Sequence, residues 1–439
     1  MQAVIMAGGK GTRLAELTRD EIPKPMVELA GKPLLLWQIE RLKENGIQDI
    51  LLVIGHLGSV IRDYFGDGSR FGVRIRYFEE KEPLGTAGSF YYLKDLIGDE
   101  EFLMMSGDLM FDVDFDRMVQ FHREKKAAAT LFVHPNGHPY DSDLLALDEE
   151  DRVIRFDSKH NTRDYWYENC VNAGIFVFGR RIFDYVPEPV KRNLENDVIQ
   201  AMVQSGEAVY GYRSPEYVKD VGTMERIHQT QRDLERGIIE RKCLRKKQKC
   251  IFLDRDGTIN IYKGLIAREE ELALEPCAAQ AIRKINESGF LAVVITNQPV
   301  VARGMCGMED VHRIHRKLET LLGREGVYLD GIYFCPHHPD KGYPEENPAY
   351  KIDCECRKPK TGLIEAAAKR FHIDLEHSWM VGDMTMDIQT GVNAGMHTAL
   401  VKTGKAGSDG KYEAQPDLVC GDLLEAVEKI LEGEEGEEI

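Results

Sequence analysis

The sequence starts the same structural pattern twice, and this restart is its strongest constraint on the fold. The run "AVIMAGG" (residues 3–9) is an apolar strand that leads into a glycine turn, and "CIFLDRDGT" (residues 250–258) is a second such strand that ends in polar residues. After each start, apolar strands alternate with amphipathic helices, which is typical of α/β domains with largely parallel sheets. At 439 residues the chain is also long for one hydrophobic core. We therefore predict two α/β domains.

The boundary between the predicted domains falls in a basic stretch, "ERKCLRKKQK" (residues 240–249). We place the first domain at residues 1–235, a basic linker at residues 236–249 and the second domain at residues 250–430. Such a run is most often a solvated helix end or linker, and a docking site for an acidic partner is the alternative. The end, "EGEEGEEI", is acidic and has no core-facing side, so residues 431–439 are expected to form a disordered tail.

Net charge and hydropathy narrow the classes of function. A formal net charge of −17 argues against general nucleic-acid binding, which needs a basic face. Anionic small substrates stay open, because a local group of Lys, Arg and backbone N–H groups can bind a phosphate. No apolar run is long enough to cross a bilayer, and the apolar N-terminal stretch is too short for a signal peptide. We expect a cytoplasmic protein without nucleic-acid or membrane partners; a homo-oligomer remains compatible with the sequence.

Clustered cysteines raise the question of a metal site. In a cytoplasmic protein, nine cysteines do not imply disulfides. The stretch from residue 335 to residue 356 holds C-x-H and C-x-C pairs, formed by Cys335, His337, Cys354 and Cys356. Thiolates and an imidazole in that number predict a closed tetrahedral site, which favours structural zinc. A disulfide, a C-x-C redox pair and His338 in place of His337 are the alternatives. The remaining cysteines are expected to be mostly small buried hydrophobic residues.

A phosphate-binding turn is predicted at the start of the chain. "AGGKGTRL" (residues 7–14) follows the first strand directly, and its glycines let backbone N–H groups approach a phosphate chain. The turn fits neither G-x-G-x-x-G nor the Walker pattern. Lys24, between two prolines, is a charge on a stiff backbone, which reduces the entropic cost of holding a phosphate.

These motifs belong to a longer ordered set. "AGGKGTRL", "PKPMVELAGKPLL", "EPLGTAGSF", "SGDLMFDVD", "NAGIFVF" and "YVKDVGTMERI" follow one another over residues 1–235. In this order they resemble the sugar-phosphate nucleotidyltransferases. The resemblance implies a Rossmann-like domain with a mixed sheet. It also implies transfer of a nucleoside monophosphate from an NTP to a sugar 1-phosphate, with release of pyrophosphate.

The resemblance also assigns residues to this site. It implies that the nucleotide is bound by Ala7, Gly8, Gly9, Gly11, Thr12, Arg13, Lys24, Gly85, Thr86, Gly88 and Asp108. Arg13 and Lys24 would neutralise charge during transfer, and Asp108 and Asp220 would bind Mg²⁺, which prefers carboxylate oxygens. The sugar phosphate would contact Lys159, Asn172 and Gly174. Many relatives have Glu-Lys-Pro around Lys159, where this chain has Ser-Lys-His.

The strand that opens the second predicted domain ends in a pair of acids. Asp254 and Asp256 follow a buried strand and are separated by one residue, so their side chains point the same way. One carboxylate can attack phosphorus while the other donates a proton to the leaving group. Alone, such acids could simply cap a helix. Further polar residues follow later strands: Thr296, Asn297, Gln298, Arg357, Lys358, Asp383 and Asp387.

This second set resembles the haloacid dehalogenase-like phosphatases, with a doubly wound parallel sheet over residues 250–430. The resemblance implies Asp254 as nucleophile, Asp256 as general acid and base, and Thr296 and Lys358 as phosphoryl ligands. It implies that Mg²⁺ is held by Asp254, the backbone carbonyl of Asp256, and Asp383, with Asp387 behind them. The sugar phosphate would contact Asn297, Gln298, Arg357 and Lys358.

Within that superfamily the zinc loop narrows the resemblance further. "DRDGTIN", "CPHHP", "CECRKP" and "VGD" resemble the D-glycero-D-manno-heptose-1,7-bisphosphate 7-phosphatases, and histidinol phosphatases share the loop. Pro299 and Val300 stand where relatives usually have Ser-Gly, and "INIYKGLIAREEEL" is shorter than the usual loop. Both departures lie near the expected substrate pocket.

Together the halves predict a bifunctional enzyme of nucleotide-heptose biosynthesis. A phosphatase that leaves heptose 1-phosphate would feed a domain that consumes it, with Mg²⁺ at both sites and one zinc. Relatives that join these activities favour GTP as the NTP. The alternatives are a histidinol-phosphate-type phosphatase joined to a hexose-1-phosphate nucleotidyltransferase, and a first domain that binds nucleotide sugar only to regulate.

Overall fold

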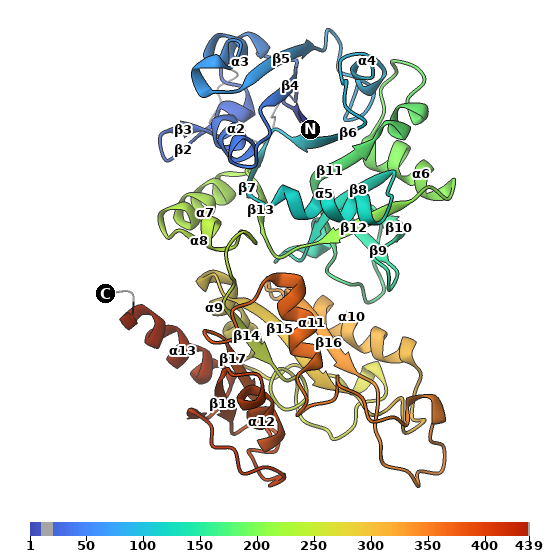
Figure 1. Cartoon of the computed structure of the whole chain (residues 1–439), viewed down its shortest axis with the longest axis vertical. Helices are drawn as coiled ribbons and strands as arrows, with labels where there is room; N and C mark the ends of the chain where they lie inside the picture. The colour runs from blue at the N-terminus through green and yellow to red at the C-terminus, as the bar shows by residue number, and fades with distance from the viewer. Residues whose placement is uncertain (10–20, 438–439) are drawn as a thin grey trace. The chain divides into compact units, whose positions relative to one another are not determined.

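The computed structural model describes residues 1–9 and 21–437. It divides into two compact units (Figure 1). The first contains Met1–His134, Asp143–Asn161 and Cys170–Arg245, and the second contains Pro135–Ser142, Thr162–Asn169 and the chain from Lys246 onward. The last change of unit therefore falls after Arg245, inside the stretch predicted as a linker.

The first unit is built on a mixed nine-stranded sheet with the order β10-β9-β11-β6-β1-β4-β5, to which β8 and β12 attach beside β11. Its strands are β1 (Gln2–Met6), β4 (Asp49–Ile54), β5 (Arg74–Glu79), β6 (Glu101–Ser106), β8 (Ala129–His134), β9 (Leu144–Leu147), β10 (Val153–Asp157), β11 (Val171–Gly179) and β12 (Val209–Arg213). The pairs of β1 with β4 and β6 are parallel, and β11 runs antiparallel to β6. The predicted mixed Rossmann-like sheet is confirmed.

Both faces of this sheet are buried, which explains the continuous apolar runs of its strands. Ala3 and Ile5 of β1 belong to one hydrophobic cluster, and Val4 between them belongs to another. Side chains alternate across a strand, so a strand buried on both faces must be apolar at every position. Helix α2 (Leu34–Glu44) adds Leu35 and Ile39 to the first cluster.

A short antiparallel ribbon continues the first unit beyond the sheet. Strand β7 (Leu109–Asp112) pairs with β13 (Tyr217–Asp220), and helices α7 (Met224–Glu235) and α8 (Ile238–Arg241) follow. Part of the basic stretch is folded into this unit: the Arg245 guanidinium donates to the Asp112 carboxylate at 2.5 Å. At least this basic charge is therefore paired within the fold.

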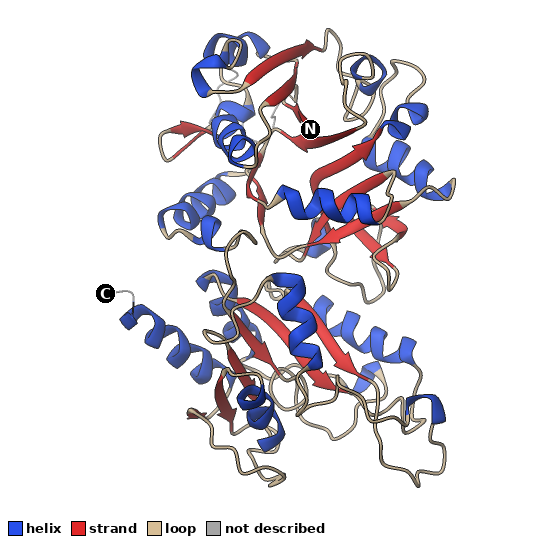
Figure 2. Cartoon of the chain, in the orientation of Figure 1, coloured by secondary structure: helices blue, strands red, loops and turns tan. Residues whose placement is uncertain are grey.

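The second unit has a six-stranded sheet in which every pairing is parallel, with the order β16-β15-β14-β17-β18-β19 (Figure 2). Its strands are β14 (Cys250–Leu253), β15 (Leu291–Asn297), β16 (Gly331–Cys335), β17 (Trp379–Gly382), β18 (His397–Val401) and β19 (Leu418–Cys420), and its helices include α9 (Ala278–Ser288), α10 (Met308–Arg324), α11 (Gly362–Phe371), α12 (Thr385–Asn393) and α13 (Leu423–Glu437). The predicted parallel sheet is confirmed.

The acidic end departs from the prediction of a disordered tail. Helix α13 continues to Glu437, and its residues Ile430 and Leu431 pack into the core of the second unit. The ammonium of Lys249 pairs with the carboxylate of Glu434, so part of the acidic run is used in a tertiary contact. An ion pair with a residue so distant in sequence cannot be read from local composition.

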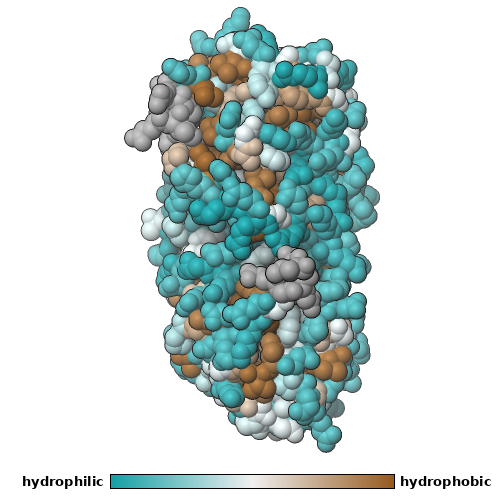
Figure 3. Space-filling view, turned by 90° about the vertical axis from the view of Figure 1, so that its left-hand side faces the viewer, coloured by the Kyte–Doolittle hydropathy of each residue, from teal (hydrophilic) through white to brown (hydrophobic). Residues whose placement is uncertain are grey.

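Figure 3 shows hydrophilic residues over most of the viewed face, with smaller apolar areas between them. Among the described residues, no helix combines the length and the apolar character that spanning a bilayer requires.

Glu216 is a buried acid that ties separate segments of the first unit together. Its side-chain Oε1 accepts the backbone N–H groups of Asp114 (2.7 Å) and Leu244 (2.9 Å), and Oε2 accepts the Ser214 hydroxyl at 2.9 Å. The residue is 1% exposed. Burial raises the pKa of Glu216 to about 7, although these hydrogen bonds act in the opposite direction.

We expect the Glu216→Gln variant to show a shallower pH dependence of stability than the wild type. The pKa is about 7 when folded and about 4.3 in an unfolded chain. The folded wild type therefore holds an extra proton between these values and loses stability as the pH rises through them. The variant lacks this term of about 3 kcal/mol. Urea unfolding of both proteins at pH 5 and pH 8 measures it; equal changes in unfolding free energy would contradict the assignment.

Candidate functional site

In the first unit, strand pairing brings the predicted metal-binding acids together. Asp108 follows β6, and Asp220 is the last residue of β13, where it pairs with Leu109. The Val221 N–H donates to the Asp108 carbonyl at 2.8 Å. The pairing of β7 with β13 thus brings these two acids, which are far apart in the sequence, close together in space.

Each of these acids already has a cation. The Lys24 ammonium donates to Asp108, the Ser106 hydroxyl donates to the same carboxylate at 2.6 Å, and the Arg226 guanidinium pairs with Asp220. Burial tends to raise the pKa of Asp108, but Lys24 and Ser106 lower it below its usual value. A Cβ added to Gly222 would lie 2.8 Å from Asp220 Oδ2 and 3.3 Å from Lys24 Nζ, so Lys24 and Asp220 meet at this glycine.

Arg226 was not predicted from the sequence. It lies on α7, whose Thr223 N-cap accepts the Arg226 N–H at 3.3 Å and so orients the first turn of the helix. The one available signal was a basic residue soon after the acid, which is too common to be informative.

The glycine turn leaves β1 beside the end of β4. The Ala7 N–H donates to the Val53 carbonyl at 2.8 Å. A Cβ on Gly8 would lie 3.2 Å from a Glu80 carboxylate oxygen, and one on Gly9 would meet no described atom within 4 Å. The predicted residues Gly11, Thr12 and Arg13 lie outside the described residues.

The second predicted glycine group packs against the chain near residue 192. Gly85 has φ +76°, and a Cβ there would lie 2.3 Å from the Arg192 carbonyl oxygen. The Thr86 hydroxyl accepts the Leu194 N–H at 2.7 Å, and a Cβ on Gly88 would lie 2.2 Å from the Val190 carbonyl oxygen. These residues therefore have a structural reason for their identity, separate from the predicted nucleotide contact.

The predicted sugar-phosphate residues of the first unit gather around Asp143. The Lys159 N–H donates to the Asp143 carboxylate at 2.8 Å, and the Lys159 ammonium lies 3.8 Å from it. The Asn172 N–H donates to the Asp143 carbonyl at 3.0 Å. Gly174, with φ +75°, lies in an irregular stretch of β11, and its N–H donates to the Asn172 side chain at 3.3 Å. Lys159 and Asn172 thus both contact Asp143, while their contact with a sugar phosphate stays a prediction.

In the second unit, a buried lysine joins two acids. The Lys358 ammonium, 2% exposed, donates to Asp254 Oδ1 and to Asp387 Oδ1, both at 2.6 Å. Asp254 follows β14, and Asp387 lies in the first turn of α12. Burial raises the pKa of Asp254 to about 6, against the opposing charge of Lys358. Burial alone would lower the pKa of Lys358, but both acids raise it above its ordinary value.

Asp383 supplies an acid with free coordinating capacity. It is fully buried; its Oδ2 accepts the Lys405 N–H at 2.6 Å, and its Oδ1 has no hydrogen-bond partner. Burial and the charges of Asp254 and Asp387 raise the pKa of Asp383 to about 8. Oxygens of these three acids lie within 4.8 Å of one another. An orphaned buried oxygen beside other carboxylates fits a hard divalent cation such as Mg²⁺.

Asp256 is held by a set of donors. Arg255 Nη2 donates to both Asp256 oxygens, at 2.9 and 2.8 Å, while Asn260 and Gln298 each donate to one, at 3.0 and 2.8 Å. Arg255 is fully buried and its Nη1 meets the ring of His315 at 3.2 Å. Asp256 is thus fixed by several donors, and sequence reasoning missed the contacts of Arg255 with Asp256 and His315.

The remaining predicted residues of the second unit make different hydrogen bonds. The Thr296 hydroxyl, 1% exposed, accepts the Gln298 amide at 3.0 Å. The Asn297 side chain accepts the Lys358 N–H at 3.0 Å and donates to its carbonyl at 3.2 Å, so Asn297 positions Lys358. The Arg357 guanidinium donates to the His337 carbonyl at 3.0 Å.

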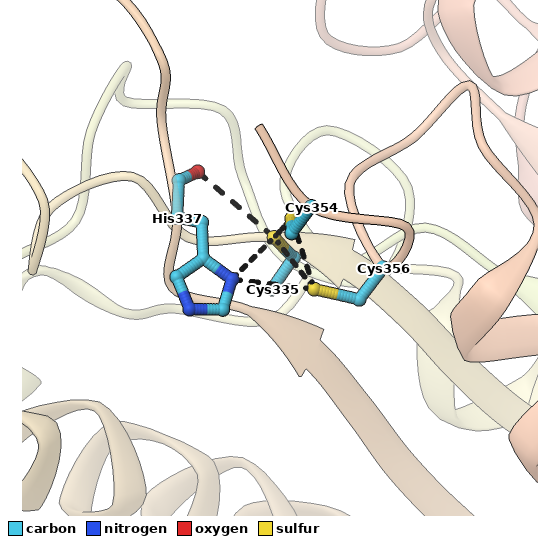
Figure 4. A group of neighbouring side chains, drawn as sticks. All are labelled: Cys335, His337, Cys354 and Cys356. Atoms are coloured by element: carbon cyan, nitrogen blue, oxygen red, sulfur yellow. Dashed lines mark hydrogen bonds between the residues drawn. The ribbon is translucent and has the colours of Figure 1, made fainter. Parts of the chain in front are cut away.

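The cysteine–histidine cluster forms as predicted at the end of β16. Cys335, Cys354 and Cys356 place their sulfur atoms 3.2–3.4 Å apart, and His337 Nδ1 lies 3.4 Å from the Cys356 sulfur (Figure 4). These separations are too long for a disulfide bond, which is about 2.05 Å, and suit ligands around one tetrahedral metal ion. The neighbouring His338 ring instead accepts the Asp340 N–H at 3.2 Å. This contact favours His337 as the ligand.

Comparisons with known proteins agree with this geometry. A family model described as nucleotidyl transferase matches residues 2–237, and one described as HAD-hydrolase-like matches residues 355–426. Mannose-1-phosphate guanylyltransferase of Mycobacterium tuberculosis is 35% identical over 246 residues, which is 56% of this chain and 67% of that protein. D-glycero-beta-D-manno-heptose-1,7-bisphosphate 7-phosphatase of Haemophilus ducreyi is 37% identical over 182 residues, which is 41% of this chain and 97% of that protein.

The chain belongs to the nucleotidyl transferase family through its first half and to the heptose-bisphosphate 7-phosphatase family through its second. Among solved structures, that of HddC from Yersinia pseudotuberculosis has a TM-score of 0.47 and 24% identity, and covers 53% of this chain and 99% of that one. The nucleotidyl transferase match contains Lys24, Asp108 and Asp220, and the HAD match contains Lys358 and Asp383. The predicted classes of enzyme, a nucleotidyltransferase and a phosphatase, are confirmed.

Metal binding by the cysteine–histidine cluster can be tested directly. We expect the Cys354→Ser/Cys356→Ser variant to lose about one bound metal ion per chain, because two serine hydroxyls cannot replace two thiolates. Elemental analysis of the purified protein measures the metal. Cys306→Ser, which changes a partly buried cysteine away from the cluster, is the matched control and should keep it. Full retention of the metal in the double variant would rule out the cluster as its site.

Proposed function

We propose that the chain makes nucleotide-activated heptose in two steps. Its phosphatase half removes the 7-phosphate of D-glycero-D-manno-heptose 1,7-bisphosphate, and its transferase half joins the resulting heptose 1-phosphate to a nucleoside monophosphate from an NTP. The observation that carries this proposal is the match to a heptose-bisphosphate 7-phosphatase over 97% of that protein's length. With an NTP as co-substrate, we place both reactions in the cytoplasm.

In the phosphatase step, Asp254 is the nucleophile. Its carboxylate attacks phosphorus and forms an aspartyl phosphate, while the bond to the sugar oxygen breaks and Asp256 supplies the proton that this oxygen needs. Asp256 then takes a proton from water, which attacks the aspartyl phosphate and releases inorganic phosphate. Lys358 remains beside Asp254 throughout and offsets negative charge on the phosphoryl group.

Mg²⁺ fits this site. Asp254 and Asp383 would hold it, with the backbone carbonyl of Asp256, and Asp387 would act through Lys358, which it contacts at 2.6 Å. When bound, Mg²⁺ supplies positive charge to the transferring phosphoryl oxygens. The protein's own part is to keep two carboxylates and one lysine buried and fixed for that purpose.

We assign structural zinc to the cysteine–histidine cluster. Three sulfur ligands and one imidazole leave no open position for a substrate in tetrahedral coordination, which is the pattern of structural sites. The cluster also holds the chain next to Lys358, since Arg357 follows Cys356 directly and donates to the His337 carbonyl. Zinc there would fix the approach to Lys358 in a loop with little apolar burial of its own.

In the transferase step, the phosphate oxygen of heptose 1-phosphate attacks the α-phosphorus of the NTP and pyrophosphate leaves. Lys24 lies between Asp108 and Gly222, where it can neutralise negative charge that develops on the phosphates. Asp108 and Asp220 offer oxygens for Mg²⁺. Lys159, Asn172 and Gly174 line the proposed sugar-phosphate side, and Gly85, Thr86 and Gly88 the proposed base and ribose side. GTP is the proposed NTP because a guanylyltransferase relative is 35% identical, whereas a uridylyltransferase relative is 31% identical.

We expect the Asp254→Asn variant to separate the two activities. The change removes the nucleophile, so phosphate release should fall by several orders of magnitude, while nucleotidyl transfer to supplied heptose 1-phosphate stays within a few-fold of wild type. The measurements are phosphate release from heptose 1,7-bisphosphate and pyrophosphate release with each of the four NTPs. Loss of both activities in a folded variant would contradict two independent sites.

We also expect dephosphorylation to precede nucleotidyl transfer. Lys24 is paired with Asp108 and Lys159 with Asp143, so neither is a spare cation for a second phosphate. A phosphate group without a partner in a partly closed site costs about 2 kcal/mol, or about thirtyfold in kcat/KM. The ratio of kcat/KM for heptose 1-phosphate and the 1,7-bisphosphate in the Asp254→Asn variant measures this preference. A ratio near one would mean that the transferase site accepts either substrate.

A further inference from the structure

Arg255 is a fully buried arginine whose guanidinium has partners on two sides. On one side its Nη2 donates to both oxygens of Asp256, at 2.9 and 2.8 Å, and its Nε donates to one of them at 3.2 Å. On the other side its Nη1 lies 3.2 Å from Nε2 of the His315 ring. One guanidinium therefore joins the proposed proton donor of the phosphatase to a histidine of α10.

The contact between Arg255 and His315 defines the state of the histidine ring. A guanidinium has N–H donors and no acceptor, so the Nε2 atom that faces it must be the unprotonated nitrogen of a neutral imidazole. Burial lowers the pKa of His315 well below its ordinary value, and the charges of Arg255 and His312 act in the same direction. His315 is thus a neutral hydrogen-bond acceptor that carries its proton on Nδ1.

His315 is itself held in place by its helix and by an aromatic ring. Its neighbours Ile314 and Leu318 on α10 pack into the core of the second unit. The His315 ring meets the Phe334 ring of β16 edge-on, with the ring centres 5.0 Å apart and the planes at 68°. An acceptor in a fixed place selects one orientation of the long arginine side chain, which would otherwise have many rotamers.

Loss of this acceptor would change how Arg255 contacts Asp256. The Nη1 group is buried, and a buried donor without a partner is unfavourable, so the guanidinium would turn toward another acceptor. The Asp256 carboxylate is the acid already in contact with it. Asn260 and Gln298 donate to the same carboxylate at 3.0 and 2.8 Å, and these contacts would remain. We therefore expect Asp256 to be displaced but still bound.

We propose that His315 is a positioning residue of the phosphatase, which acts through Arg255 to hold the Asp256 carboxyl group where it can protonate the leaving oxygen of the substrate. This inference rests on the proposed function, in which Asp256 is the proton donor, and adds a residue on which that role depends. His315 itself touches neither the substrate nor the metal ligands in this account; its effect passes entirely through the guanidinium of Arg255.

The leaving group decides how much this position matters. When Asp254 attacks phosphorus, the bond from phosphorus to the leaving oxygen breaks, its electron pair goes to that oxygen, and the oxygen takes the proton of Asp256. A sugar hydroxyl is a very weak acid, so its oxygen needs the proton as the bond breaks. A 4-nitrophenolate ion is stable without a proton. A displaced Asp256 should therefore slow the cleavage of a sugar phosphate much more than that of 4-nitrophenyl phosphate.

The test compares these two substrates by kcat/KM, which reports the steps up to departure of the leaving group. We expect His315→Leu to lower kcat/KM for heptose 1,7-bisphosphate by about tenfold to a hundredfold. For 4-nitrophenyl phosphate the loss should stay within about threefold. His315→Gln, whose amide oxygen can accept from Arg255, should recover most of the activity on the sugar phosphate. Unchanged metal content and nucleotidyl transfer show that each variant is folded.

His312→Leu is the matched control. His312 lies one turn earlier on α10 and its ring packs on the same Phe334 ring, with centres 5.4 Å apart. It should leave both values of kcat/KM within about twofold of wild type.

A double-mutant cycle shows whether His315 acts through Arg255. Arg255→Met removes the donors to Asp256, so adding His315→Leu to this variant should cause no further loss on the sugar phosphate. A further loss as large as that of His315→Leu alone would mean that the two residues act independently, and would overturn the inference.

Equal losses on both substrates in His315→Leu, or no loss on the sugar phosphate, would also overturn it. If the wild type hydrolyses 4-nitrophenyl phosphate but not the heptose compound, the proposed sugar is wrong. Fructose 1,6-bisphosphate, which has a leaving oxygen of the same kind, then takes its place in the comparison, and the role of His315 is decided there. If the wild type hydrolyses the heptose compound and His315→Leu keeps the ratio of the two values, the function stands and the inference is wrong.

Discussion

The Lys358 ammonium, held between the buried acids Asp254 and Asp387, is the interaction on which the second half of the chain depends. Each contact is 2.6 Å, and the three residues come from different parts of the chain: Asp254 follows β14, Lys358 lies in the loop before α11, and Asp387 lies in α12. Removing one member of a buried ion pair costs about 3–5 kcal/mol, because the other charge is left uncompensated. Asn297 binds both the N–H and the carbonyl of Lys358, so even the backbone beside this lysine is fixed.

The two sites treat their negative charge differently. In the first unit each predicted metal-binding acid has a cation of its own, Lys24 for Asp108 and Arg226 for Asp220. In the proposed transferase step, Lys24 would pass from Asp108 to the phosphates of the NTP, which would leave Asp108 oxygens for a metal ion. In the second unit a single lysine contacts two of three clustered acids, and the pKa of the third, Asp383, rises to about 8. That excess of carboxylate favours a divalent cation before a phosphate can approach.

The sequence predicted what depends on local pattern and on an ordered set of motifs. The strands β1 and β14, the Cys335–His337 pair and the acids at strand ends all follow from residue type and spacing. Contacts between segments distant in sequence could not be predicted in this way. Arg255 stands between two acids in the sequence, yet its side chain contacts His315 of α10, which is far away along the chain. The composition of the acidic end predicts disorder, whereas in the structure Glu434 pairs with Lys249. Gly85 looks like a ligand-binding glycine, although the Arg192 carbonyl alone excludes a side chain there.

The two phosphates of a sugar bisphosphate give the chain a chemical order. One phosphate must meet a nucleophile and a proton donor, which Asp254 and Asp256 supply. The other must be held without being cut, so it must lie out of reach of the Asp254 carboxylate. In the proposed order of reactions, the phosphate that the phosphatase leaves on the sugar is the nucleophile of the second reaction. There it meets a site whose Lys24 and Lys159 are already matched by acids. In this proposal, one half of the chain leaves intact the phosphate that reacts in the other half.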